Sequence, residues 1–326
     1  MKNLKFMFVR LSENCNSGCF MCGYAKKHDS YNLSEEKFEK LLNLMREEGT
    51  YEVVRFTGGE PMLHPQLAHF IKRCKEEGYK TSIISNCFLL PYQYKKLCDA
   101  GLDQIIVSLD GATKEVHDKL RNFPGCYDNI IKGVNLVKQQ YPNVHVRVNT
   151  VVSRENIESL EQMATLLESL QIDSWSLIPL RSSINYYNED LSKYIELYSS
   201  FKKRVETLKQ PKILGYCKSW AGRTEKEVEN LFVNNKLYAP ATNCRLVENV
   251  RFYIPEPEMI VPCNCAAHRT EQINTDKNKF EDLEKDAEFM QQWLSENGPK
   301  VCTGCEPLNV YMAEHPECID EEVFNF

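Results

Sequence analysis

The chain lacks any long hydrophobic run. No stretch of its 326 residues approaches the roughly 20 consecutive apolar residues needed to cross a bilayer, so we predict no membrane-spanning helix. The first residues, MKNLKFMFVRLSEN, are interrupted by Arg10 and Glu13 and contain no small-residue cleavage site. They therefore predict a first β-strand and not a signal peptide. We expect a cytoplasmic protein without a membrane partner.

An excess of positive charge is also absent. The sequence has 40 lysines and arginines against 46 aspartates and glutamates, a formal net charge of -6 and a pI near 5.8. Such a chain has no general electrostatic attraction to phosphate backbones, so we expect a small-molecule substrate and no nucleic-acid partner. Internal repeats and low-complexity segments are missing too. With 42% hydrophobic and 26% charged residues, the sequence predicts a globular protein with a sizeable core.

Cysteine, by contrast, is abundant, with 14 residues. In a large chain without an export signal, metal ligation or catalysis is a better expectation for these thiols than disulfides. Cys15, Cys19 and Cys22 are spaced C-x3-C-x2-C. Three thiolates can hold three irons of a [4Fe–4S] cube and leave the fourth iron open to a substrate or cofactor. The alternative is a zinc site, for which His28 is the local candidate for a fourth ligand.

Short apolar, β-branched segments alternate with amphipathic segments in the first half of the chain. The apolar segments are mostly continuous, which is typical of buried parallel strands. Six β–α units in this order predict a parallel sheet with right-handed crossovers, curved into a partial (β/α)6 barrel of the TIM type. In such a barrel the chemistry lies at the carboxyl ends of the strands. The predicted strands are residues 4–10, 51–56, 80–85, 104–110, 144–152 and 174–180, and the predicted helices are residues 33–49, 65–77, 91–100, 126–140 and 155–170.

The alternation stops near residue 182. We predict that residues 1–181 form the barrel, 182–243 a helical insertion or linker, and 244–326 a small α+β domain. The last of these contains a predicted hairpin, in which VRFYIP and MIVPCNC flank the turn PEPE, and a helix over 280–296. The sequence thus predicts two folded units joined by a polar, tyrosine-rich segment.

A GGEP motif, Gly58 to Pro61, follows the second predicted strand, as the three cysteines follow the first. With both motifs in these positions, residues 4–180 resemble the radical S-adenosylmethionine (SAM) superfamily. The resemblance implies that the amino and carboxylate groups of SAM chelate the open iron. It also implies that a flavodoxin- or ferredoxin-type protein supplies the electron that cleaves SAM, and that the resulting 5′-deoxyadenosyl radical abstracts hydrogen from a substrate.

Further SAM contacts are implied where this sequence matches positions of the family. The GGEP backbone and Glu60 would hold the methionyl amine. Ser108 and Arg121 match positions that hold the ribose and the carboxylate, and the planar guanidinium of arginine suits a carboxylate. Met21 stands where relatives have an aromatic residue packed on adenine, and its polarizable sulfur can also pack on a ring. The implied cofactor-binding residues are Met21, Gly58, Gly59, Glu60, Pro61, Ser85, Asn86, Ser108, Arg121 and Asn149.

Cysteines near the C-terminus carry a second resemblance. Four of them, spaced C-x18-C-x38-C-x2-C, resemble the ligands of the twitch domain, a shortened SPASM extension of radical SAM enzymes with one auxiliary [4Fe–4S] cluster. Two [4Fe–4S] clusters are then implied for the chain. The spacing alone also fits a zinc ribbon. The implied ligands are Cys244, Cys263, Cys302 and Cys305, with Cys265 and Cys318 as alternates.

Cys217 lies between the two predicted units and is a candidate hydrogen-atom donor to a substrate radical, as in radical epimerases of the superfamily. A packed linker cysteine is the alternative. We expect dehydrogenation, epimerisation or radical C–C bond chemistry on a sugar-, aminocyclitol- or nucleoside-like intermediate of antibiotic biosynthesis. Modification of a ribosomal peptide or protein side chain is the second hypothesis, and an electron carrier or iron–sulfur sensor the third. Because the first predicted strand begins so near the start of the sequence, we expect no leader-recognition domain, and this favours a small molecule.

Overall fold

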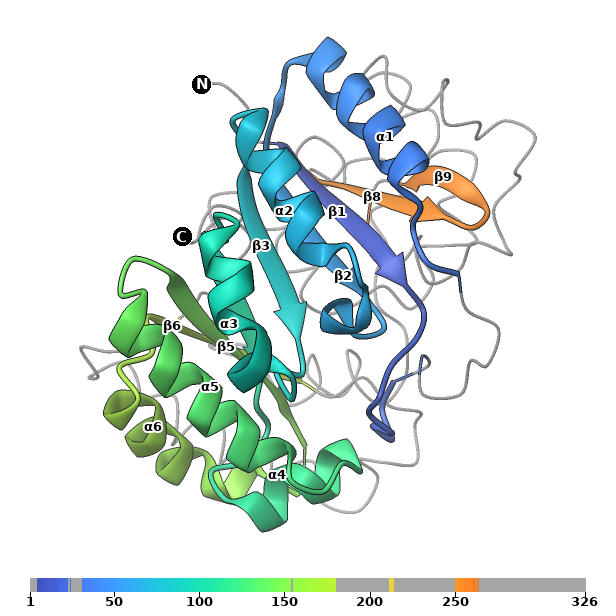
Figure 1. Cartoon of the computed structure of the whole chain (residues 1–326). Coiled ribbons are helices and arrows are strands. Elements are labelled where there is room, and N and C mark those ends of the chain that lie inside the picture. The colour runs from blue at the N-terminus through green and yellow to red at the C-terminus, as the bar shows by residue number, and fades with distance from the viewer. Residues whose placement is uncertain are drawn as a thin grey trace, which may run out of the picture.

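One curved β-sheet organises the chain (Figure 1). The computed structural model describes residues 5–22, 24, 31–153, 155–179, 211–213, 250–261 and 263. Over these residues the strand order is β7-β6-β5-β4-β3-β2-β1-β8-β9, and only the β8–β9 pair is antiparallel. The strands are β1 (Lys5–Ser12), β2 (Tyr51–Gly58), β3 (Lys80–Ser85), β4 (Gln104–Ser108), β5 (His145–Val152), β6 (Ser174–Pro179), β7 (Lys212–Ile213), β8 (Val250–Pro255) and β9 (Glu258–Val261).

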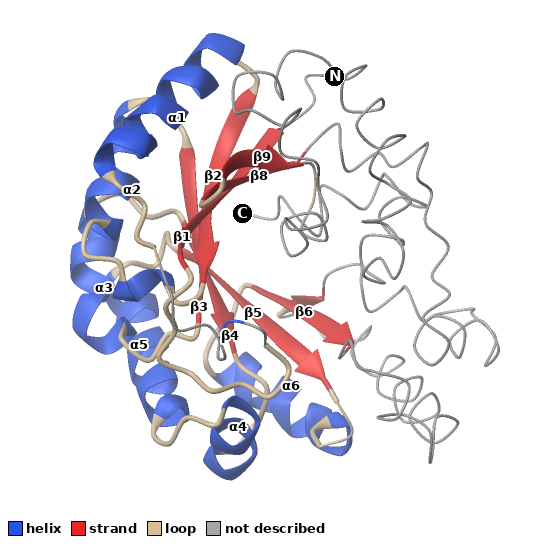
Figure 2. Ribbon diagram, turned by 90° about the vertical axis from the view of Figure 1, so that its right-hand side faces the viewer, coloured by secondary structure: helices blue, strands red, loops and turns tan. Residues whose placement is uncertain are grey.

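Helices cover one face of this sheet, and Figure 2 shows them following its outer curve. Strands and helices alternate from β1 to β6, so the predicted open parallel α/β barrel is confirmed. Within the described residues no helix is both long and apolar enough for a membrane span. The helices are α1 (Glu35–Glu48), α2 (Leu67–Glu76), α3 (Leu90–Asp99), α4 (Lys114–Arg121), α5 (Cys126–Gln140) and α6 (Leu160–Ser169), with short 3-10 helices η2 (Pro61–Leu63) and η3 (Ile157–Ser159).

Helix α1 illustrates how local sequence sets the helix ends. The hydroxyl of Ser34 accepts a hydrogen bond from the backbone N–H of Lys37 and caps the first turn. Gly49 ends the helix in the left-handed conformation, with φ at 64°, which an L-residue with a side chain adopts only at a cost. Between these ends the apolar positions recur at helical spacing and bury one face against the sheet. The buried residues are Phe38, Leu41, Leu42 and Met45.

The two faces of the sheet differ in chemistry. Alternate strand residues such as Val54 and Phe56 are fully buried in the hydrophobic core that packs beneath the helices. On the opposite face, Arg55 donates to the Ser82 hydroxyl at 3.2 Å and to Gln104 Oε1 at 3.0 Å across β3 and β4. Because side chains alternate along a strand, the outer surface of the open barrel carries the core, while the inner surface carries polar groups beside aromatic rings such as Phe6 and Phe8, over which Arg55 lies.

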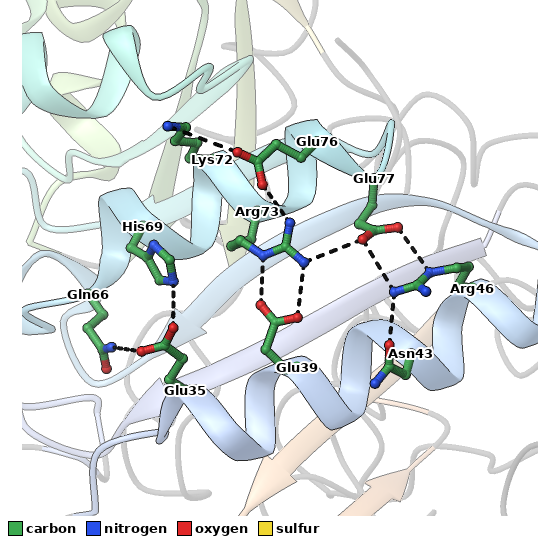
Figure 3. A network of polar contacts seen from close by, with 10 residues as sticks. All are labelled: Glu35, Glu39, Asn43, Arg46, Gln66, His69, Lys72, Arg73, Glu76 and Glu77. Carbon is green, nitrogen blue, oxygen red and sulfur yellow. Dashed lines mark hydrogen bonds and ion pairs between the residues drawn. The ribbon is translucent and has the colours of Figure 1, made fainter.

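A polar network joins α1 and α2 on the outside of the molecule (Figure 3). Arg73 on α2 makes a bidentate contact with Glu39 on α1, with Nε–Oε1 at 2.7 Å and Nη2–Oε2 at 3.0 Å. Glu77 bonds Arg46 at 3.0 Å, and Glu35 bonds His69 at 3.1 Å. Partly exposed pairs of this kind contribute up to about 1 kcal/mol each. The network therefore adds modestly to the core packing that already holds the two helices together.

The C-terminal hairpin lies at an edge of the main sheet. β8 and β9 pair antiparallel around the turn at 255–258, as VRFYIP and MIVPCNC predict. β8 also pairs in parallel with β1, and Phe252 stacks on Phe8 with ring centroids 4.4 Å apart. In the segment interpreted as a helical linker, the described residues add a short strand, β7, beside β6. The sheet therefore continues beyond residue 181 at both of its edges.

Candidate functional site

The carboxyl ends of β1 to β4 meet at one edge of the sheet, where parallel sheets place their sites. The cysteine loop follows β1, the GGEP motif follows β2, and Ser85 with Asn86 follows β3. Ser108 is the last residue of β4. The fold thus brings together motifs that are far apart in the sequence.

The glycines of GGEP allow the end of β2 to approach the cysteine loop. The backbone N–H of Gly59 donates to the Ser12 carbonyl and that of Glu60 to the Asn14 carbonyl, both at 2.7 Å. A Cβ atom added to Gly59 would lie 2.0 Å from the Asn14 carbonyl oxygen. On Gly58, where φ is 128°, it would lie 2.3 Å from the Ser12 carbonyl oxygen. These glycines therefore allow the backbone at the end of β2 to pack directly against the cysteine loop.

The Glu60 carboxylate connects the ends of β2 and β3. It is 2% exposed, and its Oε1 accepts from the Ser85 hydroxyl at 2.6 Å and from the Met62 N–H at 3.0 Å. Its Oε2 accepts from the Asn86 N–H at 2.7 Å. Burial raises the pKa of Glu60, and these hydrogen bonds oppose that rise. A carboxylate has about four acceptor positions, so the group can hold these donors and still accept from an amine.

Each residue of the spacer between Cys15 and Cys19 contacts another part of the site. Asn16 Oδ1 accepts from Asn86 Nδ2 at 2.8 Å. The Ser17 hydroxyl donates to the Arg121 carbonyl at 3.0 Å. A Cβ atom on Gly18 would lie 2.7 Å from Nδ2 of Asn122. The loop is therefore docked on both the end of β3 and the end of α4.

Arg121 lies at the end of α4 with its guanidinium between an acid and a cysteine. Its Nε is 2.6 Å from Asp110 Oδ2, and its Nη1 lies 3.9 Å from Cys19 Sγ. Burial lowers the pKa of Arg121, but Asp110 and Cys19 more than compensate and hold it above its usual value. Neither Asp110 as a site residue nor α4 was predicted from the sequence. Their signals were an acidic residue two positions after the end of β4 and a helix cap at Thr113, whose hydroxyl accepts from the Val116 N–H.

Ser108 and Asn149 are neighbours across β4 and β5. They are register partners in the parallel pair, so their side chains lie on the same face, and both are half-buried. Asn149 Oδ1 accepts from Arg147 Nε at 2.9 Å. Met21 is also half-buried, whereas the adjacent Phe20 is 50% exposed. The structure thus places Ser108 and Asn149 together at the strand ends and Met21 in the cysteine loop.

The three N-terminal cysteines differ in environment. Cys19 is buried, while Cys15 and Cys22 are half-buried. Burial raises the pKa of the Cys15 thiol to about 11. Over the described parts of the chain, no three His, Cys, Asp or Glu side chains are arranged to hold a single metal ion. An iron–sulfur cube differs in this respect, because its thiolates each bind a different iron.

Of the C-terminal candidates, Cys263 alone falls within the described residues. It lies just beyond β9, is half-buried and packs against the edge of the core. The remaining predicted positions lie outside the described residues, so the proposed auxiliary ligand set and hydrogen donor stay predictions. These positions are Cys217, Cys244, Cys265, Cys302, Cys305 and Cys318.

Behind the Asp110–Arg121 pair lies His117, which is fully buried. Its Nδ1 accepts from the Asp110 N–H at 3.1 Å, and its Nε2 has no hydrogen-bond partner among the described residues. Burial, and then the charge of Arg121, lower the pKa of His117 to about 3. The ring is therefore neutral near pH 7 and serves as an acceptor that fixes the start of the β4–α4 connection.

We expect His117 to make folding sensitive to acid. Its usual pKa is about 6.5, so between about pH 6.5 and pH 3 the unfolded chain binds a proton that the folded chain does not. The contribution of His117 to the free energy of unfolding is full above about pH 6.5 and falls as the pH drops. At about pH 5 it is lower by about 2 kcal/mol. In urea unfolding, His117→Asn, which keeps an acceptor but does not titrate, should show a flatter pH dependence. Equal dependence in the two proteins would contradict this account.

Comparison with known proteins places the chain in a family. Residues 9–167 match the radical SAM superfamily. The chain is 30% identical over 211 residues to a "Probable GTP 3',8-cyclase" of Saccharolobus islandicus, covering 62% of this chain and 68% of that protein. The chain belongs to the radical SAM superfamily. Enzymes of this superfamily use SAM and a [4Fe–4S] cluster.

Two further relatives show how far the likeness extends. An "AdoMet-dependent heme synthase" of Oleidesulfovibrio alaskensis is 27% identical over 173 residues, which are 52% of this chain and 44% of that protein. The chain thus spans less than half of that relative. The crystal structure of Streptococcus suis SuiB bound to SAM superposes with a TM-score of 0.67 at 16% identity, covering 90% of this chain and 68% of SuiB. SuiB is also known bound to its precursor peptide SuiA. At 16% identity this similarity shows a shared fold and nothing about function.

Proposed function

We propose that the strand-end site binds a [4Fe–4S] cluster through Cys15, Cys19 and Cys22 and binds SAM beside it. The observation that carries this proposal is the joint docking of the cysteine loop. Gly59 and Glu60 hold its start through hydrogen bonds of 2.7 Å, while Arg121 reaches Cys19 from α4. The loop, the buried carboxylate and the guanidinium are thereby held around one point at the edge of the sheet.

The donor set fits both groups. Thiolates are the ligands of iron–sulfur clusters, and three of them leave one iron for SAM. When bound, the cluster would supply one electron for cleavage of the C5′–S bond of SAM into methionine and a 5′-deoxyadenosyl radical, which would take a hydrogen atom from the substrate. We propose a flavodoxin- or ferredoxin-type protein as the source of that electron.

The residues around the loop would bind and orient SAM. Glu60 has acceptor capacity for the methionyl amine, and its buried position excludes competing water. Arg121 has five N–H donors in a planar fork, so it can hold Asp110 and Cys19 and also receive the SAM carboxylate. Ser108 and Asn149, adjacent on one face, would bind the adenosyl part together with Ser85, Asn86 and Met21.

For the substrate we propose a sugar-, aminocyclitol- or nucleoside-like intermediate that is dehydrogenated, epimerised or coupled through a new C–C bond. The name of the cyclase relative, which refers to the nucleotide GTP, supports a small molecule. An auxiliary [4Fe–4S] cluster on Cys244, Cys263, Cys302 and Cys305 would accept the electron that dehydrogenation releases, while Cys217 would return a hydrogen atom in epimerisation. The likeness to SuiB, bound to precursor peptide SuiA, favours peptide modification as the second candidate.

Anaerobic reconstitution and a SAM-cleavage assay test this proposal. We expect about eight irons per chain if both clusters form, and about four if only the SAM cluster does. Reduced enzyme should convert SAM to 5′-deoxyadenosine, and a deuterated substrate should transfer deuterium into that product, as read by mass spectrometry. Candidate sugars, nucleosides and short peptides are compared in parallel. Reconstituted, reduced enzyme that forms no 5′-deoxyadenosine with or without substrate would exclude the proposed reaction.

A further inference from the structure

Two polar groups lie close to the sulfur of Cys19. The hydroxyl oxygen of Ser17 lies 2.9 Å from its sulfur, and Arg121 Nη1 donates to the same sulfur at 3.9 Å. Cys19 is also buried, with 8% of its surface exposed. Contacts to a buried sulfur act in a low-dielectric environment, where hydrogen bonds and charges have larger effects than in water.

The Ser17 hydroxyl has one proton and faces two acceptors. In the structure it donates to the Arg121 carbonyl at 3.0 Å, and the Cys19 thiol can donate to the hydroxyl oxygen in turn. A cysteine that ligates iron has no thiol proton to give. The oxygen lone pairs of Ser17 would then face a thiolate at 2.9 Å, which is repulsive unless the hydroxyl proton turns toward the sulfur.

The charged acceptor determines where that proton goes. Hydrogen bonds to an ionised group are roughly twice as strong as those between neutral groups. The Arg121 carbonyl belongs to the last residue of α4, where backbone carbonyls lack partners within the helix and water can replace the serine. The proton should therefore move from the carbonyl to the sulfur when Cys19 binds iron.

From this geometry we infer that Ser17 is a tuning residue, which donates a hydrogen bond to the Cys19 thiolate and raises the reduction potential of the SAM cluster. Reduction adds one electron, and so one negative charge, to the cluster. A donor on a ligating sulfur stabilises that added charge, which makes the cluster easier to reduce. The inference rests on the proposed role of Cys19 as a cluster ligand. It assigns a function to Ser17, which lies between the first two cysteines of the motif at a position that the C-x3-C spacing does not specify.

The test compares the midpoint potential of the SAM cluster in reconstituted full-length protein and two variants. Ser17→Ala removes the hydroxyl, and Ser17→Thr keeps it. Potentials are read from the EPR signal of the reduced cluster during a dithionite titration without substrate. We expect Ser17→Ala to shift the potential to a more negative value and Ser17→Thr to remain near wild type. Iron content is measured for each protein, so that loss of the cluster is distinguished from a change in its potential.

An unchanged potential in Ser17→Ala with full iron content would overturn the inference but leave the proposed function intact. A wild-type protein that takes up no iron would instead remove the proposed function. A second measurement reads the hydrogen bond directly. Arg121 also carries exchangeable protons near this sulfur, so hyperfine spectra of the reduced cluster in H2O and D2O are compared between wild type and Ser17→Ala. An exchangeable proton coupling should be lost in Ser17→Ala and kept in Ser17→Thr, and identical couplings in wild type and Ser17→Ala would also overturn the inference.

Discussion

Gly59→Ala should destabilise the protein and prevent cluster assembly. The added Cβ would lie 2.0 Å from the Asn14 carbonyl oxygen and 2.8 Å from the Glu13 carbonyl carbon, where no non-bonded carbon can remain. Both neighbours are backbone atoms, so no side chain can turn away to make room. The start of the cysteine loop would have to move, which would break the bonds from Gly59 and Glu60 N–H. We expect a loss of about 3 kcal/mol or more, at the upper end of the range for overpacking.

Gly78→Ala is the matched control for that substitution. Gly78 has no heavy atom within 4 Å of an added Cβ, but its φ is 85°. The substitution should therefore cost only the left-handed strain of about 1–2 kcal/mol and leave iron uptake unchanged. Urea midpoints and iron content after reconstitution are measured for both variants. Normal iron uptake by Gly59→Ala would show that the approach of β2 to the loop is not required for the site.

The strands were the most predictable part of the fold. Short segments with β-branched, aromatic or other apolar residues, such as 80–85 and 174–180, are followed by polar residues typical of turns, and the structure has strands at Lys80–Ser85 and Ser174–Pro179. Parallel order then determines which ends meet, so the sequence could place the cysteine loop, GGEP and Ser85 at one edge. These predictions needed only local patterns and one general rule about parallel sheets.

Tertiary contacts between distant loops could not be predicted in the same way. The Ser17 hydroxyl donates to the carbonyl of Arg121, and β8 pairs with β1, although no local sequence pattern indicates either contact. α4 has only two apolar residues, Val116 and Leu120, in its eight, so its periodicity is too weak to reveal it. Its position determines where Arg121 lies. The site residues that the sequence missed are therefore those whose roles depend on α4.

Asp110→Asn is expected to have the second large effect, because it leaves a buried arginine without its counter-charge. The Asp110 side chain has 0% exposure and that of Arg121 has 12%. Asp110 Oδ1 also accepts from the Val151 N–H at 2.8 Å, so an asparagine that keeps this bond must turn its amide donor toward Arg121. Removing one partner of a buried ion pair costs about 3–5 kcal/mol. The affinity for SAM should fall as well, since Asp110 orients the guanidinium proposed to hold the SAM carboxylate.

The exposed pair of Lys114 and Asp128 supplies the control for Asp110→Asn. Asp128→Asn also removes one negative charge from an ion pair. Solvent screens the exposed Lys114–Asp128 pair, so the free energy of unfolding should change by at most about 1 kcal/mol. In the double variant Asp110→Asn with Arg121→Gln, no buried charge is left alone, and part of the lost stability should return, whereas SAM affinity should not. Urea midpoints and SAM dissociation constants separate these outcomes. If Asp110→Asn costs no more than Asp128→Asn, the buried pair does not hold Arg121 in place, and another contact must orient it toward Cys19.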